Sequence, residues 1–157
     1  MVASLVGCAT PPREDASAAD GLAQVDALLR QADTGMAVQL AVQPSQVRIG
    51  EDVRLLVNAK GPGYLYVYQV NADTKRVVQV FPNAVDGANY SAGGTVALPR
   101  ATWRITAGGP AGVGYFVAVV SPTAMDLNAV AVEVGQGRIP RPAQYGAAMG
   151  SLREVAP

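Results

Sequence analysis

The spacing of apolar residues predicts one helix near the N-terminus. Within residues 15–34, Leu22, Val25, Leu28 and Leu29 recur at intervals of three and four residues, with polar side chains between them. This is the periodicity of an amphipathic helix. Its apolar face could pack on the body of its own domain or on another protein, and we expect the first.

After Gly35 the apolar positions alternate with polar ones, which predicts strands. The runs are short and are separated by turns rich in Gly, Pro, Asn and Asp. The run at residues 114–120 is almost entirely apolar, as expected for a central strand that is buried on both faces. The predicted strands cover residues 38–42, 53–57, 64–70, 76–81, 95–98, 103–106, 114–120 and 129–134.

Seven or eight short strands of this kind predict an all-β fold. We expect an immunoglobulin-like antiparallel β-sandwich, preceded by one amphipathic N-terminal helix. The chain then divides into a tether at 1–14, the helix at 15–34, the sandwich at 35–134 and an extension at 135–157. Because the extension is rich in Gly and Pro, we expect a loop or tail there.

Composition narrows the function classes. The 157 residues include 12 Lys+Arg, 12 Asp+Glu, one Cys and no His. A net charge of zero provides no basic field for nucleic acid. The lack of histidine excludes Ser-His-Asp and Cys-His triads and imidazole metal sites, and one cysteine excludes an internal disulfide. We expect no cofactor, no metal site and no enzymatic activity.

The first residues resemble the lipobox of bacterial lipoproteins. In Leu5-Val6-Gly7-Cys8 an aliphatic residue and two small or modest residues precede the chain's only cysteine, and a stretch rich in Ala, Pro and Ser follows as a flexible tether would. Only seven residues precede Cys8 and none is basic. A full signal needs a basic start and about 7–15 apolar residues, so that signal would begin upstream. The alternative is an incidental cysteine.

The lipobox resemblance implies an acylated Cys8. It further implies a periplasmic protein anchored to the outer membrane, because alanine rather than aspartate follows the cysteine. No other segment approaches the roughly 20 apolar residues of a transmembrane helix. We therefore expect attachment to the membrane through the lipid anchor only.

Five short motifs follow one another between residues 39 and 121. They are Arg48-Ile49-Gly50-Glu51-Asp52-Val53, Gly63-Tyr64-Leu65-Tyr66-Val67-Tyr68, Val80-Phe81-Pro82-Asn83, Val96-Ala97-Leu98-Pro99 and Gly108-Gly109-Pro110-Ala111-Gly112. In order and spacing they resemble a bacterial family known as domain of unknown function 4384. The resemblance implies a small β-sandwich module of envelope lipoproteins and of extracytoplasmic parts of signalling proteins, in some cases beside secretion-system genes, including type VI. The family has no established activity and supplies no catalytic residues.

Aromatic and polar residues of the predicted sandwich are candidates for an interaction surface. Exposed tyrosines on a sheet could bind a glycan, a peptide or a partner protein. We expect at least two of the three tyrosines in the strand at 64–70 to be core residues or to lie under the helix, and Trp103 to plug the core or an edge. The candidates are Tyr64, Tyr66, Tyr68, Trp103, Asn83, Asp86 and Asn89.

Three further chemistries fit the polar residues of this chain less well than ordinary turns do. A glycosidase needs two carboxylates in a cleft, but nearly all acids here lie in predicted turns or at strand ends. The Asn83, Asp86 and Asn89 series has the residue types of a calcium loop without the EF-hand spacing. Residues 108–112 lack the lysine and the helix of a phosphate loop. The candidate carboxylates are Glu51, Asp52, Asp73, Asp86, Asp126 and Glu133.

The sequence thus predicts a non-enzymatic bacterial envelope lipoprotein whose sandwich docks onto other envelope proteins, as an accessory of a secretion apparatus such as type VI. Its expected partners are envelope or secretion-system proteins and not nucleic acid. The alternative is a periplasmic ligand-binding or sensory module for glycan or peptide. A solvent-facing tyrosine row would favour ligand binding, and a buried row would favour the scaffold.

Overall fold

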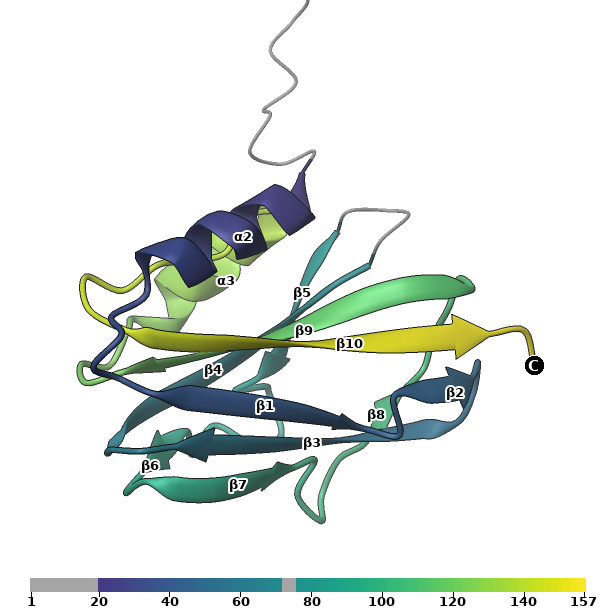
Figure 1. Cartoon of the computed structure of the whole chain (residues 1–157), viewed down its shortest axis with the longest axis horizontal. Helices are drawn as coiled ribbons and strands as arrows, with labels where there is room; N and C mark the ends of the chain where they lie inside the picture. The colour runs from purple at the N-terminus through teal and green to yellow at the C-terminus, as the bar shows by residue number, and fades with distance from the viewer. Residues whose placement is uncertain (1–19, 72–75) are drawn as a thin grey trace, which may run out of the picture.

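The computed structural model describes residues 20–71 and 76–157 and arranges them in three layers (Figure 1). A sheet of order β1-β3-β7, with β8 also paired to β3, packs on a larger sheet of order β2-β10-β9-β4-β5, with β6 also paired to β4. Two helices cover the outer face of the larger sheet (Figure 1). The elements are α2 (Gly21–Gln31), β1 (Val38–Gln43), β2 (Gln46–Arg48), β3 (Asp52–Ala59), β4 (Gly63–Val70), β5 (Val77–Phe81), β6 (Tyr90–Ser91), β7 (Gly94–Leu98), β8 (Ile105–Thr106), β9 (Gly112–Ser121), α3 (Leu127–Gly135) and β10 (Gly146–Val155).

The all-β sandwich predicted from the sequence is confirmed. The described residues form ten strands rather than seven or eight. Two of the additional strands, β2 and β6, have only three and two residues. Such short pairings leave no periodic signal in a sequence.

The main core lies between the two sheets. Because successive side chains of a strand point to opposite faces, Leu55 and Val57 of β3 meet Leu65 and Val67 of β4 across this interface. Phe116 of the central strand β9 joins them, and all five side chains are buried. This contact fixes the two sheets face to face.

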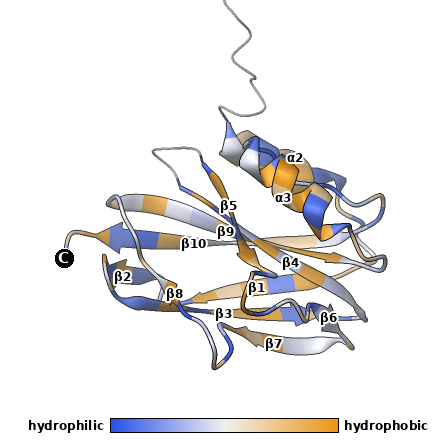
Figure 2. Cartoon of the chain, turned by 180° about the vertical axis from the view of Figure 1, so that it is seen from behind, coloured by the Kyte–Doolittle hydropathy of each residue, from blue (hydrophilic) through white to orange (hydrophobic). Residues whose placement is uncertain are grey.

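A second core lies between the larger sheet and the helices. Tyr66 and Tyr68 of β4 lie under Val25 and Leu28 of α2 and under Val130 of α3, where apolar residues of the helices and of the sheet gather (Figure 2). The N-cap Asp20 accepts a hydrogen bond from Ala23 N at 3.0 Å and so begins α2. The expectation that this helix packs on its own domain is confirmed.

The prediction of a last strand at residues 129–134 is wrong, because the chain forms helix α3 there. Asp126 caps the helix by accepting hydrogen bonds from Asn128 N (2.8 Å) and Ala129 N (3.3 Å). The helix buries Val130 and packs Val134 against the core, while Val132 is 60% exposed. Valine at every second position therefore gave the appearance of a strand, whereas the two valines that pack inward, the buried Val130 and the partly buried Val134, are four residues apart.

The expected tail at residues 135–157 is also wrong, because β10 lies inside the larger sheet between β2 and β9. Its glycines permit close packing rather than a loop. A Cβ on Gly146 would lie 2.1 Å from the Met36 carbonyl oxygen, and one on Gly150 would lie 2.7 Å from Val42 Cγ2. Only glycine lets β1 and the segment before it approach β10 so closely, so the sandwich extends well past residue 134.

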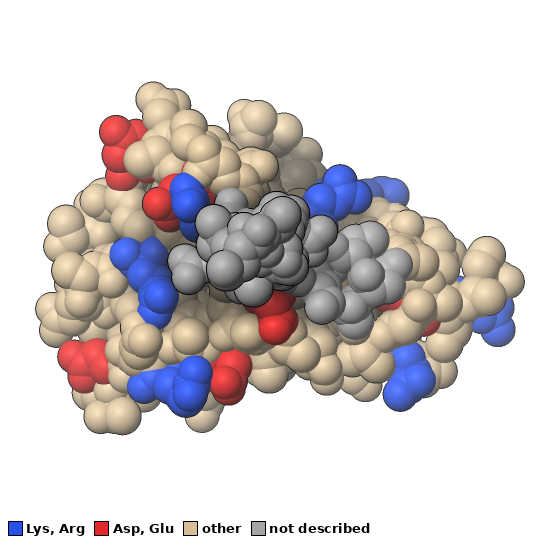
Figure 3. Space-filling model, turned by 90° about the horizontal axis from the view of Figure 1, so that it is seen from above, with Lys and Arg blue, Asp and Glu red and all other residues tan. Residues whose placement is uncertain are grey.

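The face seen from the helix side carries basic and acidic residues interspersed (Figure 3). None of the helices within residues 20–71 and 76–157 has the length and apolar character needed to cross a membrane.

Candidate functional site

Two loops on one side of the sandwich are joined by a cluster of four side chains, which we call the clasp: Phe81, Asp86, Arg100 and Trp103. Arg100 donates to both carboxylate oxygens of Asp86, from Nε at 2.7 Å and from Nη2 at 2.9 Å, and Arg100 Nη2 also donates to the Ala88 carbonyl at 2.5 Å. Trp103 Nε1 donates to Asp86 Oδ2 at 3.0 Å. The bidentate geometry is the strong form of an arginine–carboxylate pair.

Aromatic packing completes the clasp. The Phe81 and Trp103 rings are stacked with centroids 6.0 Å apart and an interplanar angle of 6°. The Arg100 guanidinium lies 5.1 Å from the Phe81 centroid, within cation–π range. The clasp thereby ties the end of β5 to the segment that leads from β7 to β8.

The electrostatics of the clasp keep Asp86 ionised. Its side chain is only 11% exposed. The hydrogen bonds from Arg100 lower the pKa of the Asp86 carboxyl below its ordinary value of 3.8; burial opposes this shift and the bond from Trp103 adds to it. Both carboxylate oxygens already accept hydrogen bonds, so this aspartate stabilises the loop.

Asn83 and Asn89 also hold the main chain in place. Asn83 Oδ1 accepts from Val85 N (3.0 Å) and Asp86 N (2.9 Å), which is an Asx turn. Asn89 lies on the opposite flank of this loop, where its Nδ2 donates to the Leu65 carbonyl at 3.1 Å. The fold thus brings Asn83, Asp86 and Trp103 together and leaves Asn89 at β4.

A groove of about 410 Å³ adjoins the clasp, between the edge of β5 and β8. β8 has only two residues, too few to cover the facing part of the larger sheet. Val80 and Ile105 supply apolar lining, Gln69 and Gln79 supply amides, and Arg104 is a charged group there with an 81% exposed side chain. The lining residues are Gln69, Gln79, Val80, Asn83, Ala84, Val85, Trp103, Arg104, Ile105 and Thr106.

The three tyrosines of β4, Tyr64, Tyr66 and Tyr68, do not form an exposed surface. The prediction that they form an interaction surface is therefore corrected. Tyr66 is 1% exposed and Tyr68 is 0% exposed, as expected for at least two of the three. Burial raises the pKa of the Tyr68 hydroxyl, and the neighbouring Tyr66 and Glu133 add to the rise. Tyr64 is half-buried and contacts the 61% exposed Tyr90 edge to face at 5.3 Å.

The exposed Tyr90 was not among the sequence candidates. It lies on the two-residue strand β6, opposite Tyr64 of β4. Such a short strand has no alternation that could have pointed to this pairing.

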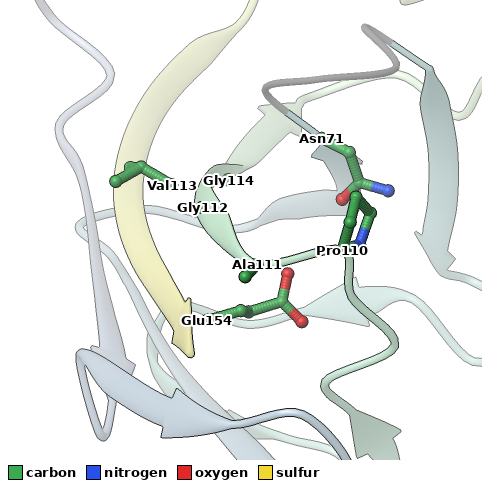
Figure 4. Close-up of a pocket in the computed structure, with 7 residues that line it drawn as sticks. All are labelled: Asn71, Pro110, Ala111, Gly112, Val113, Gly114 and Glu154. Atoms are coloured by element: carbon green, nitrogen blue, oxygen red, sulfur yellow. The ribbon is translucent and has the colours of Figure 1, made fainter. Parts of the chain in front are cut away.

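A smaller cavity of about 50 Å³ lies at the N-terminal end of β9 (Figure 4). Glu154 of β10 reaches into it and is 4% exposed, and its Oε1 accepts from Gly109 N at 3.2 Å. Asn71 Oδ1 is buried there without a hydrogen-bond partner. This volume has room for a water molecule but not for a substrate.

Two sequence candidates lie outside the described residues, namely the lipidation candidate Cys8 and the carboxylate of Asp73. Within the described ranges, no three His, Cys, Asp or Glu side chains gather as a metal ion would require.

A family model described as "Domain of unknown function (DUF4384)" matches residues 46–124. The chain belongs to this family. Neither the comparison with curated proteins nor the comparison with solved structures gives a match.

The DUF4384 segment runs from β2 through β9 and includes both the clasp and the groove. Its Phe-Pro-Asn motif places Phe81 against Trp103 and Asn83 in the Asx turn. Leu98 of its Leu-Pro motif is buried in the main core. The strands β1 and β10 and the helices α2 and α3 lie outside the matched residues, although β10 pairs with β2 and β9 inside one sheet.

Proposed function

We propose that this DUF4384 protein is a non-enzymatic bacterial envelope lipoprotein that docks onto other envelope proteins through the groove beside the clasp. The observation that carries the docking role is the groove itself, which combines an apolar lining, amide side chains and one strongly exposed arginine at a sandwich edge. Apolar lining with a few polar groups is typical of binding surfaces.

Docking fits the polar groups of this region better than catalysis does. The Asp86 oxygens are held by Arg100 and Trp103, and Asn83 is held by its own loop. A general acid or base must be free to exchange a proton with substrate. These side chains instead keep the rim of the groove rigid, which lowers the entropic cost of binding a partner.

The membrane part of the proposal rests on Leu5-Val6-Gly7-Cys8. Acyl chains on Cys8 would hold the module near membrane proteins and raise its effective concentration there. The accessory role in a secretion apparatus such as type VI rests on the family resemblance alone. Burial of Tyr66 and Tyr68 favours docking over the alternative, glycan or peptide binding by the tyrosine face.

The membrane anchor is tested in the full-length precursor with Cys8→Ser. We expect the wild type in the membrane fraction and the variant in the soluble periplasmic fraction. A variant that stays in the membrane fraction would remove the lipid anchor from the proposal.

The docking surface is tested by a photo-crosslinking residue at Val85, which is 64% exposed on the groove rim. The matched control is the same residue at Met149, which is 40% exposed on β10. We expect a discrete crosslinked envelope protein from position 85 and none from position 149. Equal products from both positions would contradict docking at the groove.

A further inference from the structure

The outer edge of β5 borders the groove, and this edge has no strand partner. In the described part of the larger sheet, β5 is a terminal strand that pairs only with β4. Its sequence, Val-Val-Gln-Val-Phe, contains neither charge nor proline, which are common devices that block edge-to-edge pairing. Such an edge is a template for one more strand.

The hydrogen-bonding phase of β5 identifies which main-chain groups face outward. At the hairpin, Asn71 N donates to the Arg76 carbonyl at 3.4 Å. Bonded pairs recur every second residue in an antiparallel ladder, so Val78 directs its main chain toward Gln69 of β4. Val77 and Gln79 therefore direct their N–H and C=O groups away from β4, and Gln79 lines the groove.

Two hydrogen bonds from side chains next to the clasp close the far end of this edge. Asn83 Nδ2 donates to the Val80 carbonyl at 3.1 Å, and Gln79 Nε2 donates to the Pro82 carbonyl at 2.8 Å. The open part of the edge is thus confined to Val77–Gln79, beside the apolar lining of Ile105 and Trp103. Val78, on the Gln69 side of the sheet, remains 39% exposed.

The charges at the groove select the partner. Arg100 is held by Asp86 and by the Ala88 carbonyl. Arg104 has only a 4.0 Å contact with Asp52, and the two side chains are 81% and 58% exposed. Such a surface pair contributes little, so Arg104 can turn to a carboxylate of a bound partner. Among the residues that line the groove, Arg104 is the one with a formal charge.

We infer that the groove binds an extended peptide segment of a partner protein, which adds a strand to β5. The peptide pairs with the main chain of Val77 and Gln79, places an apolar side chain against Ile105 and Trp103, and directs an acidic side chain to Arg104. Main-chain pairing supplies affinity and the alternate side chains supply specificity, as in other cases of strand addition. The inference deepens the proposed docking function and rests on it.

A displayed library of random 12-residue peptides, selected on the full 157-residue chain, tests this inference. We expect the selected and then synthesised peptides to alternate apolar residues and to carry at least one acid. Gln79→Pro removes the outward N–H, and proline is tolerated at an edge position of this kind. The matched control Gln79→Ala removes the same side chain and keeps the N–H.

We expect peptide affinity to fall about tenfold or more in Gln79→Pro relative to Gln79→Ala, as the loss of main-chain pairing predicts. Arg104→Glu should weaken acidic peptides by about fivefold or more, since it turns attraction into repulsion. If Gln79→Pro does not fold, amide exchange in the wild type decides: bound peptide should slow exchange of the Gln79 N–H.

Two results would overturn the inference: a library that yields no binder, and binders that are indifferent to Gln79→Pro and do not protect the Gln79 amide. Neither result touches the Cys8→Ser fractionation or the crosslinking at position 85, which test the docking function itself. A protein that crosslinks at position 85 but ignores peptides would refute strand addition alone.

Discussion

Substitution of Asp86 tests whether the clasp stabilises the fold. Asp86→Asn keeps the size of the side chain but replaces one acceptor oxygen with an NH₂ group. That group faces a donor of Arg100 or Trp103, which now bind Asp86 at 2.7 to 3.0 Å. Two donors then point at each other, and the guanidinium loses its countercharge.

The cost follows from exposure. A hydrogen bond to a charged group contributes about 1.5–3 kcal/mol, whereas an exposed ion pair contributes about 0–1 kcal/mol. The Asp86 side chain is 11% exposed and the Arg100 side chain is 41% exposed. We therefore assign about 1.5 kcal/mol to the hydrogen bond from Trp103 and at most about 1 kcal/mol to the ion pair with Arg100. We expect a loss of about 2 kcal/mol in unfolding free energy, or about 6 °C in Tm.

The assay is thermal and urea unfolding followed by tryptophan fluorescence and far-ultraviolet circular dichroism. Trp103 is the only tryptophan and donates to Asp86, so its emission reports the clasp. Asp26→Asn is the control, because its pair with Arg30 at 3.5 Å is 68% and 71% exposed and its loss should cost about 0.5 kcal/mol or less. A shift in Tm below about 1 °C for Asp86→Asn would refute the clasp as a stabilising unit.

The same variant has a pH signature. The pKa of Asp86 is lowered in the folded state by Arg100, so the stability it contributes is fully present above the ordinary value of 3.8 and is lost as pH falls through the lowered value. The difference between wild type and Asp86→Asn should therefore shrink below about pH 4. A difference that grows toward acid pH would contradict this sign.

Three further pairs of variants test the packing. Gly146→Ala would place a Cβ 2.1 Å from the Met36 carbonyl oxygen and should lower the free energy of unfolding by about 3 kcal/mol. In the control Gly61→Ala the new Cβ meets nothing within 4 Å, so equal urea midpoints for the two variants would contradict the close approach at β10. Tyr68→Phe removes a buried hydroxyl without a hydrogen-bond partner and should leave the free energy of unfolding unchanged or raise it by up to about 1 kcal/mol. Tyr145→Phe loses the 2.7 Å hydrogen bond to the Leu28 carbonyl and should lower it by about 1 kcal/mol. A larger loss in Tyr68→Phe than in Tyr145→Phe would show that the Tyr68 hydroxyl has a stabilising partner. Val130→Asp buries a charge and should unfold the domain. Val132→Asp changes a 60% exposed site and should stay within about 0.5 kcal/mol of the wild type in unfolding free energy. Similar melting temperatures for the two variants would favour a strand at residues 129–134.

Local pattern was sufficient for the centre of the fold. Continuous apolar residues marked β9 as a strand with both faces buried, and Phe116 and Val117 do belong to different cores. The amphipathic spacing marked α2 and its buried residues Val25 and Leu28. These elements follow from the sequence because burial is periodic within each of them.

The candidate site was predicted only in part. Residue type alone made Asn83, Asp86 and Trp103 candidates, and the fold brings them together beside the groove, which Asn83 and Trp103 line. No sequence pattern indicated that Arg100 binds Asp86 or that Arg104 lines the groove, because these contacts join separate loops, with Asp86 and Arg100 lying 14 positions apart in the chain. Loop contacts of this kind have no periodicity from which they could be inferred.

The sequence by itself determined the class of fold, the short amphipathic helix, the strands with regular alternation and the membership in DUF4384. The tertiary structure alone decided the conformation of the residues after β9, where α3 and β10 lie. Valines at every second position became a helix because Asp126 caps it and Val130 and Val134 share one face. A glycine-rich stretch became the strand β10 because β1 packs too close for any side chain at Gly146 and Gly150. At α3 the alternating valines hid a local cap and an i,i+4 spacing, and burial against the sheet decided between helix and strand. At β10 the deciding contact comes from β1 and the residues before it, about 100 residues earlier in the chain, so no local pattern could contain it.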